Sequence, residues 1–253
     1  NFYLPFDIRA WKIYEIFLLD AVTYIFVIFI FIFMRYTSVS QEKKNTEALL
    51  NRLKGGFKYL YNHKMIFVFG LASYMLFAFT LVEIHVLLPS YVKNFLHMDG
   101  NVFASAEIYY SFGAIFSGLL ILRIFKNFNT VIGVIILMTA VSFAFYMMAF
   151  YDFLWIFFLS NFLIGVTNAG VRIQRTTYMF NHVPNNLIGR TGSVFNTLNI
   201  IVRMLLIGAF SLPFFQIEDN IRFGYLVGLV MMVVAVFTLI IYYRRIVNAE
   251  KIA

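Results

Sequence analysis

The stretch from Asn168 to Arg203 reads NAGVRIQRTTYMFNHVPNNLIGRTGSVFNTLNIIVR. Two apolar segments meet there across a short polar connection that carries Arg172, Arg175 and Arg190, while Arg203 lies within the second segment. The pattern predicts two membrane-spanning helices joined by a basic loop, and basic loops stay on the cytoplasmic side. This hairpin therefore predicts an orientation, and the charge inside its second segment requires a functional explanation.

The composition of the whole chain agrees with a membrane location. Of 253 residues, 62% are hydrophobic and 13% are charged, and the mean hydropathy is +0.82. A water-soluble domain cannot hide this much apolar surface, so we expect a polytopic membrane protein embedded in a lipid bilayer. The net charge of +8 is distributed between apolar runs, which indicates topology and no nucleic-acid partner.

The residue types for common catalytic and metal chemistry are missing or scattered. The chain has no cysteine, which excludes disulfides, thiolate catalysis and Cys-based metal sites. Its four histidines show no metal-binding spacing, and no G-x-S-x-G or P-loop motif occurs. We therefore expect no enzyme, no bound metal and no cofactor.

Seven apolar runs are long enough to cross a hydrocarbon layer of about 30 Å. Their expected ranges are 16–34, 65–88, 102–122, 130–150, 153–172, 189–212 and 223–243. Pro89 is expected to end the second span and Pro213 the sixth. Two pairs of small residues predict close helix contacts, namely Gly113 with Ser117 and Gly224 with Gly228. The predicted fold is an all-α membrane bundle of about seven transmembrane helices.

Residues 36–64, between the first two spans, are polar and basic. Their apolar members recur at helical spacing and are Leu49, Leu50, Leu53, Phe57, Leu60 and Tyr61. Lys54 and Lys58 fall on the other side, which predicts an amphipathic helix on the cytoplasmic surface, with a solvated linker as the alternative. The chain is thus divided into a first helix at 1–35, this linker at 36–64 and a six-helix bundle at 65–253.

The distribution of Lys and Arg predicts the orientation. With the linker inside the cell, the inner side collects Arg35, Lys43, Lys44, Arg52, Lys54, Lys58, Lys64, Arg123, Lys126, Arg172, Arg175, Arg190, Arg244, Arg245 and Lys251. The outer side receives only Arg9, Lys12, Lys93 and Arg222. This bias predicts an outside N-terminus and a cytoplasmic C-terminus. Spans two to four and five to seven then start on opposite sides, as a three-plus-three inverted repeat requires.

Three stretches, together with the order of the spans, resemble the major facilitator superfamily of transporters. LKGGFKYLYNHK at 53–64 resembles the entry to the seventh helix in its drug, macrolide and siderophore exporters. VPNNLIGR at 183–190 resembles the VP…GR signature between the tenth and eleventh helices. GLLILRIFK at 118–126 is similar to a degenerate G-x-L-x-D-R-x-G-R loop, in which Leu122 replaces the Asp and Phe125 replaces the second Gly.

This resemblance implies a function and a missing part. The chain would supply the last helix of the N-terminal half, the central loop and the C-terminal half of the transporter, with the missing N-terminal bundle as its partner. It implies proton-coupled export of a small organic molecule, drug-like or siderophore-like, by alternating access in a bacterial inner membrane. A seven-helix receptor or sensor is one alternative, and a truncated half that needs a partner half is another.

Polar groups within the predicted spans are the candidate transport path, because such groups are costly in lipid unless they line water or pair. Asn196, Asn199 and Arg203 have i, i+3, i+7 spacing, so they share one helical face and predict a polar stripe. Arg203 is expected near the membrane midplane, where it balances Glu83 or attracts an anionic group of the substrate. A structural clamp between helices is the alternative for Arg203.

Glu83, His85 and Glu107 are expected in the outer thirds of two antiparallel spans. Two carboxylates at similar depth favour proton exchange, so Glu83 and Glu107 are candidates for the proton path. The alternatives are an interfacial Glu107 and a Glu83 capped by His85 or a hydroxyl. Asn168 is a further candidate, although polar residues of this kind more often bond helices together.

A second candidate set is basic and lies at the inner ends of the spans. Arg172, Arg175 and Arg190 are expected to anchor the topology and contact lipid headgroups, and the resemblance implies a gate on the inner side. Arg123 and Lys126 join this set through the degenerate loop motif.

Overall fold

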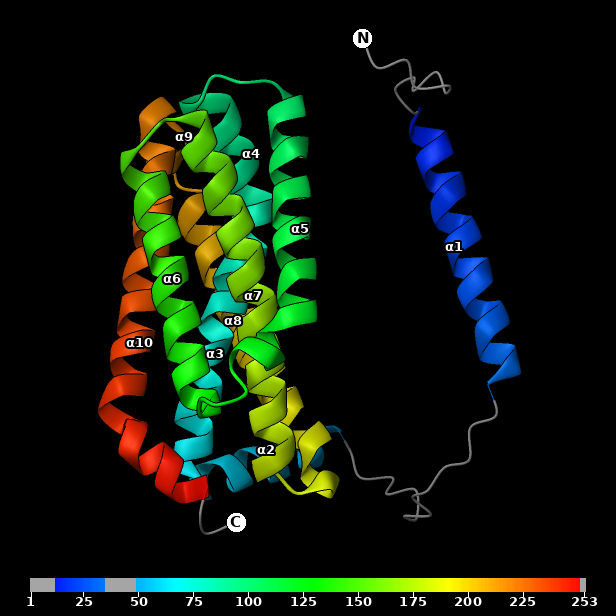
Figure 1. Cartoon of the computed structure of the whole chain (residues 1–253), viewed down its shortest axis with the longest axis vertical. Coiled ribbons are helices and arrows are strands. Elements are labelled where there is room, and N and C mark those ends of the chain that lie inside the picture. The colour runs from blue at the N-terminus through cyan, green and yellow to red at the C-terminus, as the bar shows by residue number, and fades with distance from the viewer. Residues whose placement is uncertain (1–11, 35–48, 251–253) are drawn as a thin grey trace. The chain divides into compact units, whose positions relative to one another are not determined.

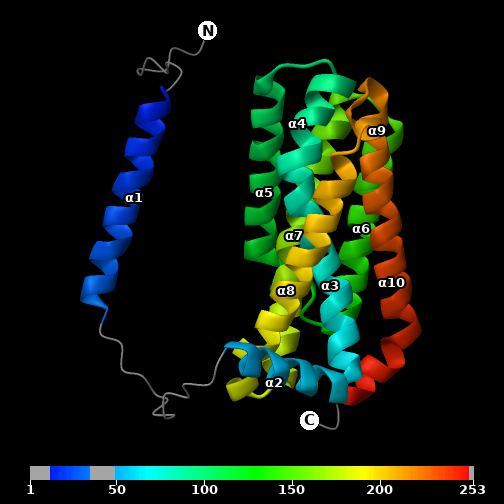
Figure 2. The same cartoon turned by 180° about the vertical axis from the view of Figure 1, so that it is seen from behind.

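The computed structural model describes residues 12–34 and 49–250, and its long regular elements there are helices. The chain forms two units, residues 1–46 and 47–253. The first contains α1 (Ile13–Phe33), and the second contains the bundle shown in Figures 1 and 2. Within the described residues, seven helices are long and apolar enough to cross a membrane. The predicted all-α membrane bundle is therefore confirmed.

Six of these long helices belong to the second unit. The first is a rod from Lys64 to Phe95, made of α3 (Lys64–Val82), the π-helix η1 (Glu83–Leu87), α4 (Leu88–Ser90) and the π-helix η2 (Tyr91–Phe95). The others are α5 (Gly100–Ile124), α6 (Thr130–Phe150), α7 (Leu154–His182), α8 (Asn185–Phe210) and α10 (Arg222–Glu250). The short helices α9 (Pro213–Gln216) and η3 (Glu218–Ile221) connect α8 to α10.

Small residues bring α5 and α7 into backbone contact. A Cβ atom added at Gly113 would overlap the carbonyl oxygen of Phe162, and one added at Gly165 would overlap that of Tyr110. A Cβ at Gly224 would lie 2.6 Å from a methyl group of Leu87. Packing of this kind replaces the hydrophobic driving force that helices lack in lipid. The predicted close approaches at Gly113 and Gly224 are confirmed.

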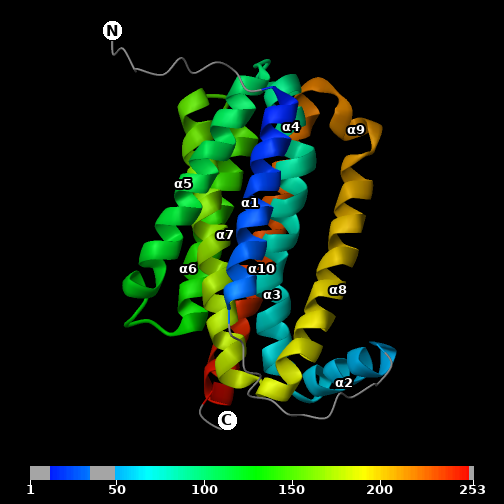
Figure 3. The same cartoon turned by 90° about the vertical axis from the view of Figure 1, so that its right-hand side faces the viewer.

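The predicted amphipathic helix is α2 (Leu49–Asn62), which packs across the first turns of α8 (Figure 3). Leu60 is buried, whereas Phe57 and Tyr61 are 54% and 67% exposed. The apolar residues of α2 therefore divide between the bundle and the surface, and Phe57 and Tyr61 share the face of Lys54 and Lys58 instead of lying opposite them as predicted. We call the end of the bundle with α2 the α2 end, and the opposite end, with α4 and α9, the α9 end (Figure 1). The predicted linker residues 36–48 lie outside the described residues.

Three predicted helix ends are wrong, and one of them is that of the seventh span, which continues past 243 to Glu250 as α10. Pro89 does not end the second span, because it lies within α4 and the rod continues to Phe95. The π-helical turn before it widens the backbone, which accommodates a ring that would otherwise clash with the preceding turn. The fifth span does not end at Arg172 either, since α7 continues to His182. Gln174 and Arg175 are buried there by neighbouring helices, so these polar residues belong to the helix.

Candidate transport site

Glu83 lies where the rod changes from α-helix to π-helix, and its side chain is fully buried. The phenol of Tyr225 on α10 donates a hydrogen bond to Glu83 Oε1 at 3.0 Å. The other oxygen, Oε2, has no hydrogen-bond partner among the described residues. The rings of Tyr91 and Phe145 lie 5.0 and 6.3 Å from that of Tyr225, so the pair lies in an apolar, aromatic part of the core. A carboxyl group with one bond in such a core is costly, which marks it as a functional candidate.

Polar side chains of η1, α5 and α7 lie near one another. Glu107 on α5 is half-buried and interacts electrostatically with Glu83. Asn168 Nδ2 donates a hydrogen bond to the hydroxyl of Tyr110 at 2.7 Å. Tyr110 in turn interacts electrostatically with Glu83, Glu107 and Arg172. The direct contact is thus the hydrogen bond that ties Asn168 on α7 to Tyr110 on α5, a residue that sequence reasoning missed, while Glu83 and Glu107 lie near enough for their charges to act on Tyr110.

Arg203 lines a cavity of about 250 Å³ between the rod and α8. The lining residues are Leu81, Val82, His85, Val86, Ile200, Arg203, Met204 and Ile207. Arg203 Nε is buried and has no hydrogen-bond partner among the described residues. Its polar neighbour in the cavity wall is His85. Glu83 bonds Tyr225 instead, so the structure does not form the expected pair of Arg203 with Glu83.

The positions of these residues along their helices differ from those predicted. Arg203 lies seven residues before Phe210, the last residue of α8, or about 10 Å from the α9 end at 1.5 Å per residue. It is therefore nearer the end of α8 than its middle, because this helix runs from Asn185 to Phe210. Glu83 is nearer the middle of its helix than predicted, because the rod extends to Phe95.

The three residues of the predicted polar stripe on α8 differ in how far they are buried. Asn199 is buried, and its Nδ2 donates a hydrogen bond to the carbonyl oxygen of Tyr74 at 3.3 Å. Arg203 is half-buried and Asn196 is exposed. Asn199 therefore ties α8 to α3, whereas Arg203 lines the cavity beside the rod and Asn196 lies on the exposed surface.

Arg175 is a clamp between α7 and α3. Its guanidinium carbon lies 3.7 Å from the centroid of the Tyr74 ring, and Nη1 donates a hydrogen bond to the carbonyl oxygen of Ser73 at 3.1 Å. The side chain is only 6% exposed, whereas a side chain that contacts lipid headgroups would lie at the surface. Tyr74 was not identified from the sequence, because an aromatic residue inside an apolar run gives no signal of its partners.

The other basic candidates occupy three different positions. Arg172 is exposed on α7, and Arg123 and Lys126 are exposed where α5 ends. Arg190 lies in the first turns of α8 against Gly55 and Gly56 of α2.

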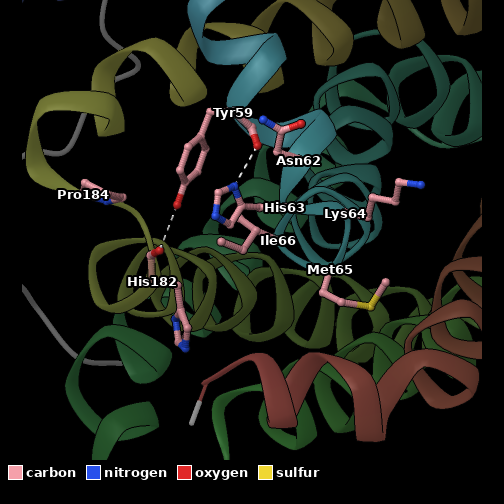
Figure 4. A pocket seen from close by; sticks show the side chains of 8 residues that line it. All are labelled: Tyr59, Asn62, His63, Lys64, Met65, Ile66, His182 and Pro184. Carbon is pink, nitrogen blue, oxygen red and sulfur yellow. Dashed lines mark hydrogen bonds between the residues drawn. The ribbon is translucent and has the colours of Figure 1, made fainter. Parts of the chain in front are cut away.

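A second cavity, of about 530 Å³, opens at the α2 end (Figure 4). Its walls are Tyr59, Asn62, His63, Lys64, Met65, Ile66, His182 and Pro184. The Tyr59 hydroxyl donates a hydrogen bond to the carbonyl oxygen of His182 at 3.2 Å, and His63 Nδ1 lies 2.9 Å from the carbonyl oxygen of Tyr59. Burial raises the pKa of Tyr59, so its phenol remains a donor. These bonds tie the α2–α3 junction to the end of α7.

The fold and the site define a class of protein. Seven helices of membrane-spanning length, six of them in a bundle with ionisable side chains inside it, define a polytopic helical membrane protein. No group of three metal-ligating side chains occurs within the described ranges.

The family model of the Major Facilitator Superfamily matches residues 8–207. The chain therefore belongs to this superfamily and is an integral membrane transporter protein. Comparison with curated proteins gave no match, and comparison with solved structures gave none either.

Proposed function

We propose that this protein exports a small organic molecule in exchange for protons by alternating access. The chain would contribute the last helix of the N-terminal half at 1–35, the linker at 36–64 and the C-terminal bundle at 65–253. The missing N-terminal bundle would complete the transport path, and a drug-like or siderophore-like molecule would be the substrate. The observation that carries the proposal is Glu83, a buried carboxyl group with one bonded and one unbonded oxygen.

Glu83 is proposed as the proton carrier. An ionised carboxylate in an aromatic core inside the membrane is costly, and binding a proton removes that cost. Oε2 is available to hold the proton while Oε1 keeps its bond to Tyr225. Glu107, which interacts electrostatically with Glu83, would pass protons between Glu83 and the membrane surface.

The Arg203 cavity is proposed as part of the substrate site. Arginine remains charged and presents several donors, so a buried Nε without a partner is suited to an anionic group of the substrate. The apolar side chains that complete the cavity wall would contact the organic body of the molecule.

The π-helical turn η1 provides a physical link between the two sites. Glu83 and His85 both belong to this five-residue turn. Glu83 contacts Tyr225 on α10, whereas His85 lines the cavity with Arg203 on α8. A shift of η1 when Glu83 gains or loses a proton would therefore move one wall of the substrate cavity.

The orientation proposed from the basic residues places the α2 end in the cytoplasm of a bacterial cell. The exposed Arg123 and Lys126, where α5 ends, would then anchor the inner side, whereas Arg172 lies within the long helix α7. Arg190 and Arg175 would hold α2 and α3 against the inner parts of α8 and α7, as elements of an inner gate.

The test uses the full-length transporter in lipid vesicles, assayed for efflux and uptake over a drug and siderophore panel with and without a pH gradient. We expect transport driven by the gradient, and Glu83→Gln should abolish this drive while the variant still binds substrate. Asp152→Asn, at an exposed acid between α6 and α7, is the matched control and should be unaffected. Transport driven by Na⁺ alone or by ATP alone would contradict the proposal. A Glu83→Gln variant with the normal response to pH would exclude Glu83 as the proton carrier.

A further inference from the structure

A groove between α2 and α8, away from the transport path, has the chemistry of a lipid site. Its volume is about 510 Å³. The lining residues are Leu53, Lys54, Phe57, Lys58 and Tyr61 from α2 and Val194, Thr197 and Leu198 from α8. The groove therefore combines an apolar wall with two lysines.

The geometry of the groove is fixed by close backbone contact. A Cβ atom added at Gly56 would lie 2.5 Å from the carbonyl oxygen of Arg190, so α2 crosses α8 with no side chain between them. Leu60 is buried and holds α2 against the bundle. Figure 3 shows α2 lying across the foot of α8, which rises away from it. The groove therefore lies in the corner between α2, which runs along the end of the bundle, and α8, which is long enough to span the membrane.

One face of α2 points into this corner. Lys54, Phe57, Lys58 and Tyr61 follow i, i+3, i+4 and i+7 spacing and so share a helical face. Phe57 and Tyr61 are 54% and 67% exposed. Lys54 and Lys58 are exposed, and as like charges one turn apart they repel each other unless an anion lies beside them.

The position and charge of this corner indicate which kind of molecule can bind there. The end of a spanning helix lies where acyl chains meet headgroups, and aromatic and basic side chains are typical of that depth. The apolar wall at Val194 and Leu198 suits an acyl chain. A phosphate with a net negative charge neutralises the lysine pair, whereas a zwitterionic headgroup brings no net charge.

We propose that this groove binds one anionic phospholipid from the leaflet on the α2 side. Its acyl chain lies against Phe57 and Leu198, and its phosphate lies between Lys54 and Lys58. This site is independent of the proposed proton and substrate sites, because it shares no residue with them.

The test is photocrosslinking in vesicles that contain the full-length transporter and a trace of phosphatidylglycerol with a diazirine in its acyl chain. Adducts are mapped by mass spectrometry of peptides. We expect adducts within 49–62 and 194–198, displaced severalfold more effectively by unlabelled phosphatidylglycerol than by phosphatidylcholine. Lys54→Gln with Lys58→Gln should lower the yield there severalfold, and Lys54→Arg with Lys58→Arg should keep it.

Lys126→Gln is the matched control, because it removes an exposed lysine at the same end of the bundle. It should leave the adduct yield unchanged, and each variant should elute as a single species with the normal melting temperature. Equal competition by both lipids would identify an ordinary lipid contact and overturn the proposal. Absence of adducts on the groove would also overturn it, because the labelled lipid would then not occupy this face.

Discussion

Tyr225 of α10 donates a hydrogen bond to Glu83, 142 positions earlier in the chain, with an oxygen-to-oxygen distance of 3.0 Å. The bond joins the first and last long helices of the bundle at a point where both side chains are fully buried. It fixes the direction of one carboxyl oxygen and leaves the other without a partner. The same pair of residues therefore joins two helices and contains the proposed proton carrier. Substitutions can separate the structural role from the proton role.

Tyr225→Phe removes only the hydroxyl and leaves a buried carboxyl group without its donor. We expect a loss of about 1–3 kcal/mol in stability, measured as a lower melting temperature of the purified full-length transporter. In a Glu83→Leu background, the same change should have little effect, because the acceptor is gone. An equal decrease in both backgrounds would show that the hydroxyl acts through another contact.

Arg175→Lys keeps the charge but loses the flat guanidinium that stacks on Tyr74 at 3.7 Å. A desolvated cation–π contact contributes about 2 kcal/mol, so the melting temperature should fall. Arg172→Lys, three residues earlier on the exposed side of α7, is the control and should leave it unchanged. A stable Arg175→Lys variant would mean that the charge alone holds α7 to α3.

Most of the fold was predictable, because apolar length and charge bias are local properties of the sequence. The expected span at 130–150 coincides with α6, whose ends are marked by the Asn129 cap and by Tyr151. The errors at Pro89 and Arg172 have one cause. A composition window treats proline and arginine as helix ends, whereas neighbouring helices bury Arg175 and a π-helical turn accommodates Pro89.

The candidate site was predictable only as a set of residue types. Helical spacing placed Asn199 and Arg203 on one face, but the neighbouring helix decides that Asn199 bonds Tyr74 and that Arg203 shares a cavity with His85. The tyrosines Tyr74, Tyr110 and Tyr225 were missed. Each lies in an apolar run, and a phenol shows its polar role only when its partner, more than 50 positions away, is in place.

Gly113→Ala tests the contact between α5 and α7. The added methyl group would overlap the carbonyl oxygen of Phe162, so the two helices must separate. We expect a marked loss of monodisperse protein in size-exclusion chromatography and a lower melting temperature. Gly118→Ala on the same helix is the control, because its Cβ would have no atom within 4 Å. Similar behaviour of the two variants would mean that this contact does not limit stability.

Arg203→Ala tests the proposed substrate role. Loss of a charge-assisted hydrogen bond costs about 1.5–3 kcal/mol, which is roughly a ten- to hundredfold increase in KM for an anionic substrate found in the panel. Arg203→Lys should retain part of the affinity. Met204→Ala, beside it in the cavity wall, should have a smaller effect. An Arg203→Ala variant that transports normally, with unchanged pH dependence, would contradict the assignment.

Single cysteines test the orientation of the bundle, because the chain itself contains none. Lys126→Cys lies in the α5–α6 connection and Asp152→Cys lies in the α6–α7 connection, and both positions are exposed. These connections are at opposite ends of the 21-residue helix α6, so they face opposite sides of the membrane. The excess of basic residues at the α2 end predicts that a membrane-impermeant maleimide labels Asp152→Cys in intact cells. Lys126→Cys should react only after the membrane is opened, because the positive-inside bias predicts a cytoplasmic position for that connection. The reverse labelling pattern would invert the topology and, with it, the proposed direction of proton flow through Glu83.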